Sequence, residues 1–226
     1  MIKISDLYKS YGKNQVLQGI DLEIQKGQVH GLVGENGAGK TTLFRCLAGL
    51  ESHSGQIQSD IDILKDNTGF LQTNPYFLSK ITGWEYLKLL CSARNIKDED
   101  FESKNIFELP LKQYAENYST GMKKKLALTG ILLQQNKVFI LDEPFNGVDI
   151  HSNIMINEII NKLRNNGKYI LISSHIFSSL SNCCDRIHLL KNGKIEKTVI
   201  KKDFEILNKE MKSFVLGDRL ENFKIK

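Results

Sequence analysis

The residues best suited to chemistry form a glycine-rich loop that ends in a lysine and two threonines. The loop runs from Gly34 to Thr42, reads GENGAGKTT and fits the spacing G-x-x-x-x-G-K-[ST]. Glycines at this spacing let successive backbone N–H groups turn toward one anion, and the N-terminus of a following helix adds its dipole. The pattern predicts a phosphate-binding loop in which Lys40 reaches the β- and γ-phosphates and the Thr41 hydroxyl binds Mg²⁺, while the N–H groups of Gly39, Thr41 and Thr42 hold phosphate oxygens.

Two carboxylates follow an apolar run later in the chain. Residues 137–144 read KVFILDEP, and the four apolar residues before Asp142 and Glu143 predict a buried strand. Open parallel sheets bind ligands at the carboxyl ends of their strands, so both acids are expected at such an edge. There Asp142 can help to hold Mg²⁺, and Glu143 can orient, or accept a proton from, a water that attacks the γ-phosphate. The alternative is that the two acids only mark the end of a strand and have no functional role. The glycine-rich loop upstream makes this the weaker interpretation.

Other polar or aromatic side chains stand at comparable positions. Gln72 ends a short expected strand over residues 69–72, and His175 follows an apolar run from Tyr169 that predicts another. His175 can donate a hydrogen bond to a terminal phosphate, although a lone histidine after a strand is more often structural. Tyr11 stands in an expected turn ahead of the loop, where it either packs against the protein or stacks on a purine base.

The surrounding pattern alternates between strands and helices. Residues 2–33 predict strands that approach the loop in an antiparallel arrangement, and the apolar run from Val29 directly before the loop predicts a buried parallel strand. Helices are expected over residues 40–48, 82–94, 120–134 and 152–164. Thr82 and Glu85 form a predicted capping box. An Asn192-Gly193 turn predicts a hairpin over residues 186–197. Residues 98–116 are expected to form a short helix and a loop, and residues after about 200 a basic helix.

Composition favours a globular protein without a membrane span. The chain has 226 residues, of which 41% are hydrophobic and 25% charged, and its net charge is +5. No apolar window approaches the ~18 residues of a spanning helix, and the N-terminus lacks a leader's apolar core, so we expect a cytoplasmic location. The lysine run 123–125 is expected to be a solvated face, and no nucleic-acid motif accompanies it. The four cysteines, without metal-site spacing, are expected to be reduced packing residues; they are Cys46, Cys91, Cys183 and Cys184.

Taken together, these motifs resemble the ATP-binding subunit of an ATP-binding cassette (ABC) transporter of the bacterial export type, whose permease is a separate chain. The resemblance implies an α/β fold: a P-loop NTPase, RecA-like core with an N-terminal antiparallel β subdomain and an inserted helical subdomain at about 73–130. It covers a domain at 1–198, followed by a short C-terminal extension at 199–226. The cofactors implied are ATP and Mg²⁺.

The resemblance also assigns roles residue by residue. Glu143, His175 and Gln72 match the family's catalytic positions, and Thr41, Gln72 and Asp142 its metal positions. The positions expected to contact nucleotide are Tyr11, Gly34, Asn36, Gly37, Ala38, Gly39, Lys40, Thr41, Thr42, Ser119 and Gly121.

The signature loop departs from the usual LSGGQ of the family. Residues 118–122 read YSTGM, which is typical of the export-type subunits, and keep the Ser119 hydroxyl and Gly121. The resemblance implies that two cassettes, identical or related, bury two ATP molecules between one chain's phosphate-binding loop and the other's signature loop. It further implies a multi-span permease, with the chain peripheral on the inner face of the membrane. The aromatic segment 74–86 is either the permease's docking surface or core of the helical lobe.

Two other classes of function share part of this pattern. A soluble ABC protein would use the same ATP-driven clamp on a cytosolic partner, and the single cassette without a coiled-coil insertion disfavours it. A small-molecule or nucleotide kinase shares only the phosphate-binding loop and leaves the signature loop, Gln72 and His175 unexplained.

Overall fold

The computed structural model describes residues 1–97 and 100–216 of the chain, with side chains to Met211. Its centre is a six-stranded sheet in the order β5-β6-β7-β3-β8-β9, in which only β9 runs antiparallel to its neighbour. The strands of this sheet are β3 (Val29–Val33), β5 (Thr68–Leu71), β6 (Val138–Asp142), β7 (Tyr169–Ser174), β8 (Arg186–Lys191) and β9 (Lys194–Ile200). A second, three-stranded antiparallel sheet has the order β2-β1-β4, from β1 (Ile2–Tyr11), β2 (Asn14–Ile24) and β4 (Ser54–Ser59).

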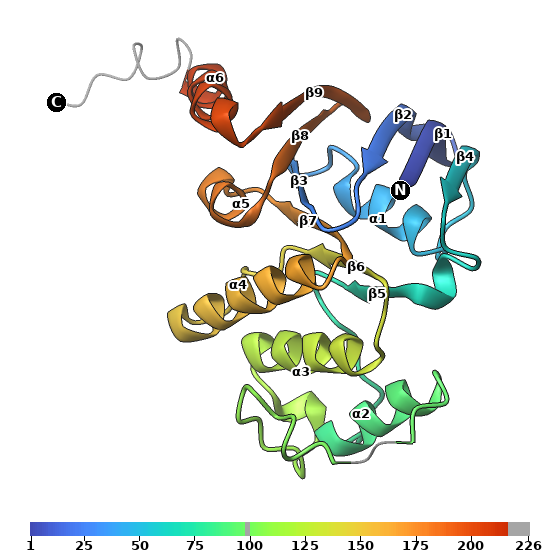
Figure 1. Ribbon diagram of the computed structural model, residues 1–226, viewed down its shortest axis with the longest axis vertical. Coiled ribbons are helices and arrows are strands. Elements are labelled where there is room, and N and C mark those ends of the chain that lie inside the picture. Colours follow the sequence, from blue (N-terminus) through green and yellow to red (C-terminus); the bar gives the residue numbers. More distant parts are fainter. Residues whose placement is uncertain (98–99, 217–226) are drawn as a thin grey trace, which may run out of the picture.

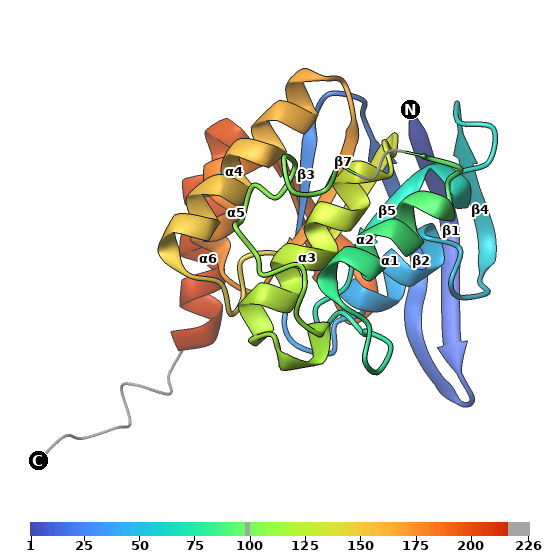
Figure 2. The same cartoon turned by 90° about the horizontal axis from the view of Figure 1, so that it is seen from below.

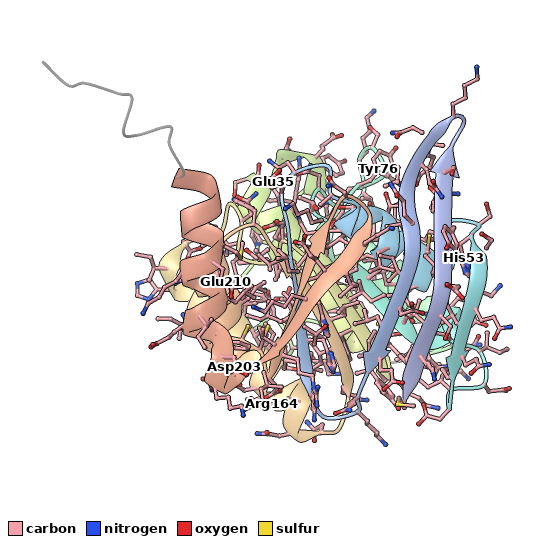
Figure 3. The ribbon with its side chains drawn as sticks, turned by 90° about the horizontal axis from the view of Figure 1, so that it is seen from above. Glu35, His53, Tyr76, Arg164, Asp203 and Glu210 are labelled. Carbon is pink, nitrogen blue, oxygen red and sulfur yellow. The ribbon has the colours of Figure 1, made fainter. Side chains whose placement is uncertain are left out.

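The helices divide between the two faces of the central sheet. Helix α1 (Lys40–Leu47) lies between the two sheets, while α3 (Thr120–Leu133), α4 (Ile150–Asn165) and α5 (Phe177–Cys183) cover the opposite face (Figure 1). Helix α2 (Gly83–Ser92) packs on α3 at the far end from β9, and α6 (Phe204–Leu216) lies next to β9 on the same face as α5. The view from below places α4, α5 and α6 together on one side and β1, β2 and β4 on the other (Figure 2). From above, His53 near β4 and Glu210 on α6 stand on opposite sides of the molecule (Figure 3).

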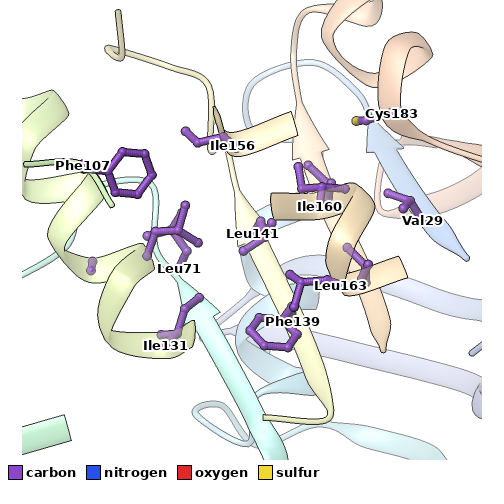
Figure 4. Close-up of a cluster of buried hydrophobic side chains, with 14 of the residues drawn as sticks. Val29, Leu71, Phe107, Ile131, Phe139, Leu141, Ile156, Ile160, Leu163 and Cys183 are labelled. Atoms are coloured by element: carbon purple, nitrogen blue, oxygen red, sulfur yellow. The ribbon is translucent and has the colours of Figure 1, made fainter. Parts of the chain in front are cut away.

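Strands of the central sheet send alternate side chains into two hydrophobic cores. Phe139 and Leu141 of β6 join the core on the side of α3 and α4, whereas Val138 and Ile140 join the one around α1. Figure 4 shows Phe139 and Leu141 close to Ile160 and Leu163 of α4. Because strands covered on both faces read as continuous apolar runs, the run before Asp142 was sufficient to predict a buried parallel strand.

Most expected elements are present, and the fold class is confirmed. The Thr82–Glu85 capping box closes in both directions, with the Thr82 N–H donating to Glu85 at 2.8 Å and the Glu85 N–H to Thr82 at 3.2 Å. All four cysteines are buried and free. In the described residues no helix is long and apolar enough to cross a membrane.

One expectation about local structure was wrong, the short helix within residues 98–116, of which 98 and 99 lie outside the described residues. Residues 100–114 form turns instead of a short helix, because Pro110 and local side-chain bonds such as Ser103 to Asp100 compete with helical ones; only a 3-10 turn follows, at Ala115–Asn117. The apolar run directly before the glycine-rich loop, expected to be a buried parallel strand, is β3 of the parallel sheet, so that expectation is confirmed. Helix α5 was not expected, because four of its seven residues are serine or asparagine, which have a lower helix propensity than alanine or leucine.

A buried chain of hydrogen bonds crosses the strand that leads into the glycine-rich loop. The Gln25 N–H donates to His30 Nε2 at 3.1 Å, His30 Nδ1 lies 3.0 Å from His188 Nε2, and His188 Nδ1 lies 2.8 Å from Thr198 Oγ1. A backbone N–H can only donate, so His30 Nε2 accepts and neutral His30 carries its proton on Nδ1. His30 Nδ1 then donates to His188 Nε2, so neutral His188 also carries its proton on Nδ1 and donates to Thr198 Oγ1. Burial is the main cause that lowers the pKa of His30 to about 4 and of His188 to about 3.

This pair should make the protein sensitive to acid. Both folded-state pKa values lie below the ordinary 6.5, so the unfolded chain binds more protons and stability falls as the pH drops below about 6.5. Each histidine contributes a slope of about 1.4 kcal/mol per pH unit in that window. Urea unfolding between pH 7 and pH 4.5 should show a shallower slope for His188→Gln than for the control His151→Gln, an exposed histidine of α4. Equal slopes for the two variants would contradict the assignment.

Candidate active site

The glycine-rich loop joins β3 to α1 and is closed by its own lysine. Gly39 caps α1 with φ of 109°, a conformation that favours glycine, and its carbonyl accepts the first helical bond from Leu43. Lys40 is buried and its ammonium donates to the carbonyls of Gly34 at 2.7 Å and Glu35 at 3.0 Å. Burial lowers the pKa of Lys40, and the carboxylates of Glu143 and Asp142 oppose that shift.

The carboxylate of Asp142 collects hydroxyl groups from three other elements. Its Oδ2 accepts hydrogen bonds from Thr41 Oγ1 at 2.7 Å and from Thr73 Oγ1 at 2.8 Å. Its Oδ1 accepts one from Ser173 Oγ, whose residue is paired with Asp142 across β6 and β7. The first residues of α1, the segment after β5 and the end of β7 are therefore joined at one buried acid.

Glu143 sits in a strained backbone conformation beside His175. Its φ is 52°, in the left-handed region that non-glycine residues rarely adopt, and its N–H donates to Ser173 Oγ at 3.0 Å. Its Oε2 lies 3.0 Å from His175 Nδ1, with Glu143 largely buried and His175 44% exposed. The two strand-end residues predicted for catalysis are thus brought into hydrogen-bond contact.

A hollow of about 710 Å³ opens in front of these groups, within the range of small-molecule sites. Its walls come from the loop, from β2 and from the strand ends at one edge of the sheet. The lining residues are Asn36, Gly37, Gly39, Lys40, Thr41 and Thr42; Asn14 and Val16; and Thr73, Asp142, Glu143, Asn146 and His175.

Some predicted residues lie outside this hollow. Gln72 is exposed directly after β5, and its neighbour Thr73 contacts Asp142 instead. Tyr11 is the last residue of β1, 44% exposed, with the Lys9 ammonium 4.9 Å from its ring centroid. Gly34 and Ala38 line a separate cavity of about 390 Å³ between the loop, the β8–β9 hairpin and α6.

The signature loop forms the N-terminus of α3. Ser119 is its N-cap, and its Oγ accepts a hydrogen bond from the Met122 N–H at 3.2 Å. A Cβ added to Gly121 would come within 2.7 Å of the Gly147 carbonyl oxygen, so glycine is needed where this loop approaches residues 146–149. Ser119 and Gly121 do not line the hollow of their own chain.

The expectation of a solvated lysine run was wrong for its middle member. Lys124 is 1% exposed, and its ammonium donates to the carbonyls of Glu143 at 2.6 Å and Asn146 at 2.8 Å. Burial lowers the pKa of Lys124, and Glu143 and Asp142 oppose the shift. The burial of Lys124 could have been predicted from helical spacing. Lys124 stands three and four residues before Ala127 and Leu128, so all three lie on the buried face of α3.

Sequence reasoning also missed the two hydroxyls on Asp142 that come from outside the loop. Thr73 follows Gln72, and Ser173 precedes His175 by two residues. Their positions at the ends of expected strands were a usable signal, but only the order of strands shows that both neighbour Asp142.

The oxygen atoms around Asp142 suit a hard divalent cation. The Thr41 hydroxyl and the Asp142 carboxylate are the donors that Mg²⁺ prefers, and Mg²⁺ commonly keeps one or two protein ligands beside substrate phosphates. The described residues hold no cluster of three or more histidine, cysteine, aspartate or glutamate side chains suited to a metal.

Comparisons with known proteins identify a family and several relatives. The model of the ABC transporter family matches residues 17–146. The lantibiotic transport ATP-binding protein SrtF of Streptococcus pyogenes is 32% identical over 219 residues, covering 91% of this chain and 92% of that protein. The bacitracin transport ATP-binding protein BcrA of Enterococcus faecalis is 29% identical over 231 residues, covering 96% and 75%.

Solved structures show the same fold. An ATP-binding subunit of an ABC transporter superposes with a TM-score of 0.80 at 24% identity, covering 92% of this chain and 93% of that one. A dimeric, post-hydrolysis form of the cassette MJ0796 bound to ADP and Pi gives 0.78 at 20% identity, covering 89% and 99%.

The parallel sheet, its glycine-rich loop and the acids facing that loop define a P-loop nucleotide-binding protein. The chain belongs to the ABC transporter family, as an ATP-binding subunit with the ATPase activity of that family.

Removing the loop lysine should weaken nucleotide binding. Lys40→Ala deletes the buried ammonium expected to meet the phosphates, and a hydrogen bond to a charged group contributes about 1.5–3 kcal/mol. The dissociation constant for ATP, measured by equilibrium titration, should rise about 10- to 100-fold. The control Lys162→Ala removes an exposed lysine of α4 and should leave it unchanged. Equal affinity of both variants would contradict the role of Lys40.

Proposed function

We propose that this chain hydrolyses ATP at the edge of the sheet where Glu143 and His175 meet, and that hydrolysis drives export through a separate membrane permease. The 3.0 Å contact between Glu143 Oε2 and His175 Nδ1, opposite the glycine-rich loop, is the observation on which the proposal depends. A carboxylate held in this way suits a group that takes a proton from, or orients, an attacking water.

Each catalytic group has a defined task in the proposed reaction. Lys40 and the N–H groups of Gly39, Thr41 and Thr42 neutralise and orient the phosphates. Glu143 orients, or takes a proton from, the water that attacks the γ-phosphate. As an imidazolium, His175 can donate from one ring nitrogen to Glu143 and from the other to the terminal phosphate.

Mg²⁺ is the proposed partner of the nucleotide, and it would neutralise the charge on the phosphates. Thr41 and Asp142 are the proposed residues that hold it, and their oxygens already lie 2.7 Å apart. Gln72 is the third proposed ligand, and its place directly after β5 puts it on the same edge of the sheet. Tyr11 is proposed to stack on the adenine from the end of the β1–β2 hairpin.

The proposed working unit is a pair of cassettes, either two copies of this chain or this chain with a relative. Ser119 accepts a bond from Met122 through its oxygen, so its hydroxyl hydrogen can be donated to a phosphate bound by the partner. Gly121 is proposed to contact the same phosphate through its backbone. The cassette MJ0796, whose fold this chain shares, forms a dimer.

Transport is supported by the relatives and by one exposed apolar surface. SrtF and BcrA are named as lantibiotic and bacitracin transport proteins, so we propose a substrate of peptide-antibiotic type. Tyr76 and Leu78 of the segment 74–86 are 78% and 54% exposed. Together with Leu89 of α2, which is 49% exposed, they form the proposed docking surface for the permease. The chain would then sit on the cytoplasmic face of the membrane, without a specific role in nucleic-acid binding.

Replacing Glu143 by glutamine should stop turnover while preserving the ATP complex. A general base contributes about 10²–10⁴-fold to a rate, so kcat for ATP hydrolysis should fall by that order, with ATP affinity retained and an ATP-bound dimer favoured in size-exclusion chromatography. Glu158→Gln, an exposed acid of α4, is the matched control. Undiminished hydrolysis by Glu143→Gln would remove Glu143 from its role.

Co-purification from the native cell tests the transport role. The tagged full chain, extracted from membranes with a mild detergent, should retain a multi-span membrane protein at near-equal abundance. A soluble partner with no enriched membrane protein would contradict the transporter assignment and indicate a cytosolic ATP-driven clamp.

A further inference from the structure

A buried lysine of the signature helix holds the backbone of the proposed catalytic glutamate. Lys124 lies on α3, five residues after the N-cap Ser119, and its side chain is almost fully buried. A buried ammonium without hydrogen-bond partners would cost a large free energy of desolvation, so its partners show which part of the structure it stabilises. They are the main-chain carbonyls of Glu143 and Asn146, at 2.6 and 2.8 Å.

These two carbonyls belong to the turn that follows β6. Asn146 N–H donates to the Glu143 carbonyl at 3.2 Å, so the turn closes on the same oxygen that accepts from Lys124. At its other end, Glu143 N–H is held by Ser173 Oγ. Both backbone polar groups of Glu143 are thereby fixed by side chains from α3 and β7.

The fixation matters because Glu143 has a φ of 52°. A non-glycine residue in this conformation costs of order 1–3 kcal/mol and persists only where its surroundings enforce it. The same conformation directs the Glu143 side chain to His175, 3.0 Å away. Without the bonds to Lys124, the turn is free to relax and the carboxylate to leave that position.

We propose that Lys124 is a positioning residue for ATP hydrolysis: it holds Glu143 in its left-handed conformation and links the orientation of the signature helix to that of the catalytic carboxylate. The inference rests on the proposed role of Glu143. Lys124 and Ser119 share one helix, so a movement of the signature loop that tilts α3 displaces the Glu143 carbonyl as well. Next to it, Lys125 contacts Asp149 at 3.4 Å and Ser152 at 3.2 Å, so α3 also holds the start of α4.

The test compares Lys124→Met with Lys124→Gln and with Lys123→Met. The methionine keeps length and removes all donors, the glutamine keeps an amide donor, and Lys123 is the neighbour without a part in this turn. In the full-length chain, Lys124→Met should lower kcat about 10- to 100-fold, as expected for a misplaced catalytic group, while the dissociation constant for ATP stays within about threefold. Lys124→Gln should recover part of kcat, and Lys123→Met should equal the wild type.

A double variant separates positioning from a general loss of structure. In Glu143→Gln, the carboxylate that Lys124 positions is gone, so adding Lys124→Met should lower the residual rate no further. A full, additive loss in the double variant would overturn the inference, as would a wild-type kcat in Lys124→Met. Failure of both Lys124 variants to fold, judged by circular dichroism, would also overturn it in favour of a structural role. Wild-type hydrolysis by Glu143→Gln alone would instead contradict the proposed function.

Discussion

The buried carboxylate of Asp142 is the constraint on which the site depends. A charged group removed from water must be matched by hydrogen bonds, and Asp142 finds them in Thr41, Thr73 and Ser173. Each hydroxyl comes from a different element, so satisfying one charge fixes α1, the segment after β5 and β7 relative to one another. The strand-end acid thus fixes the start of α1, directly after the glycine-rich loop, against the strand ends, and a cation at the same oxygens would share those partners.

Glu143 differs from Asp142, because its side chain is positioned by a strained backbone conformation and not by a set of hydroxyl donors. Its main chain is held in an unfavourable conformation by Ser173 on one side and Lys124 on the other. Ser173 serves both acids, since its hydroxyl donates to Asp142 and accepts from the Glu143 N–H. The two acids at the end of β6 are therefore coupled. Asp142 binds hydroxyl groups from the surrounding elements, and Glu143 is positioned by side chains of β7 and α3.

What the sequence reveals of this site depends on whether the residues concerned are neighbours in the chain. The loop, Asp142, Glu143 and His175 could be predicted, because each lies in a local pattern of apolar run, glycine and polar end. Thr73 and Ser173 could not, because their contact with Asp142 depends on β5, β6 and β7 being adjacent in the sheet. Lys124 was misread because three consecutive lysines resemble a solvated surface until the buried face of α3 is known. The seven-residue α5 and the turns of 100–114 escaped prediction because short elements are decided by tertiary contacts more than by local preference.

The hydrogen-bonded pair of histidines below the loop also has a consequence for how the sheet assembles. The bonds from Gln25 through His30 and His188 to Thr198 run in one direction and join β3, β8 and β9, with His188 paired to Thr198 and two residues away from the register partner of His30. A slip of one residue between β3 and β8 would turn His188 to the other face of the sheet and break its buried hydrogen bond with His30. Among possible strand pairings, these polar groups therefore select against the misaligned ones. The strand that carries the nucleotide loop is held in alignment by a feature that takes no part in catalysis.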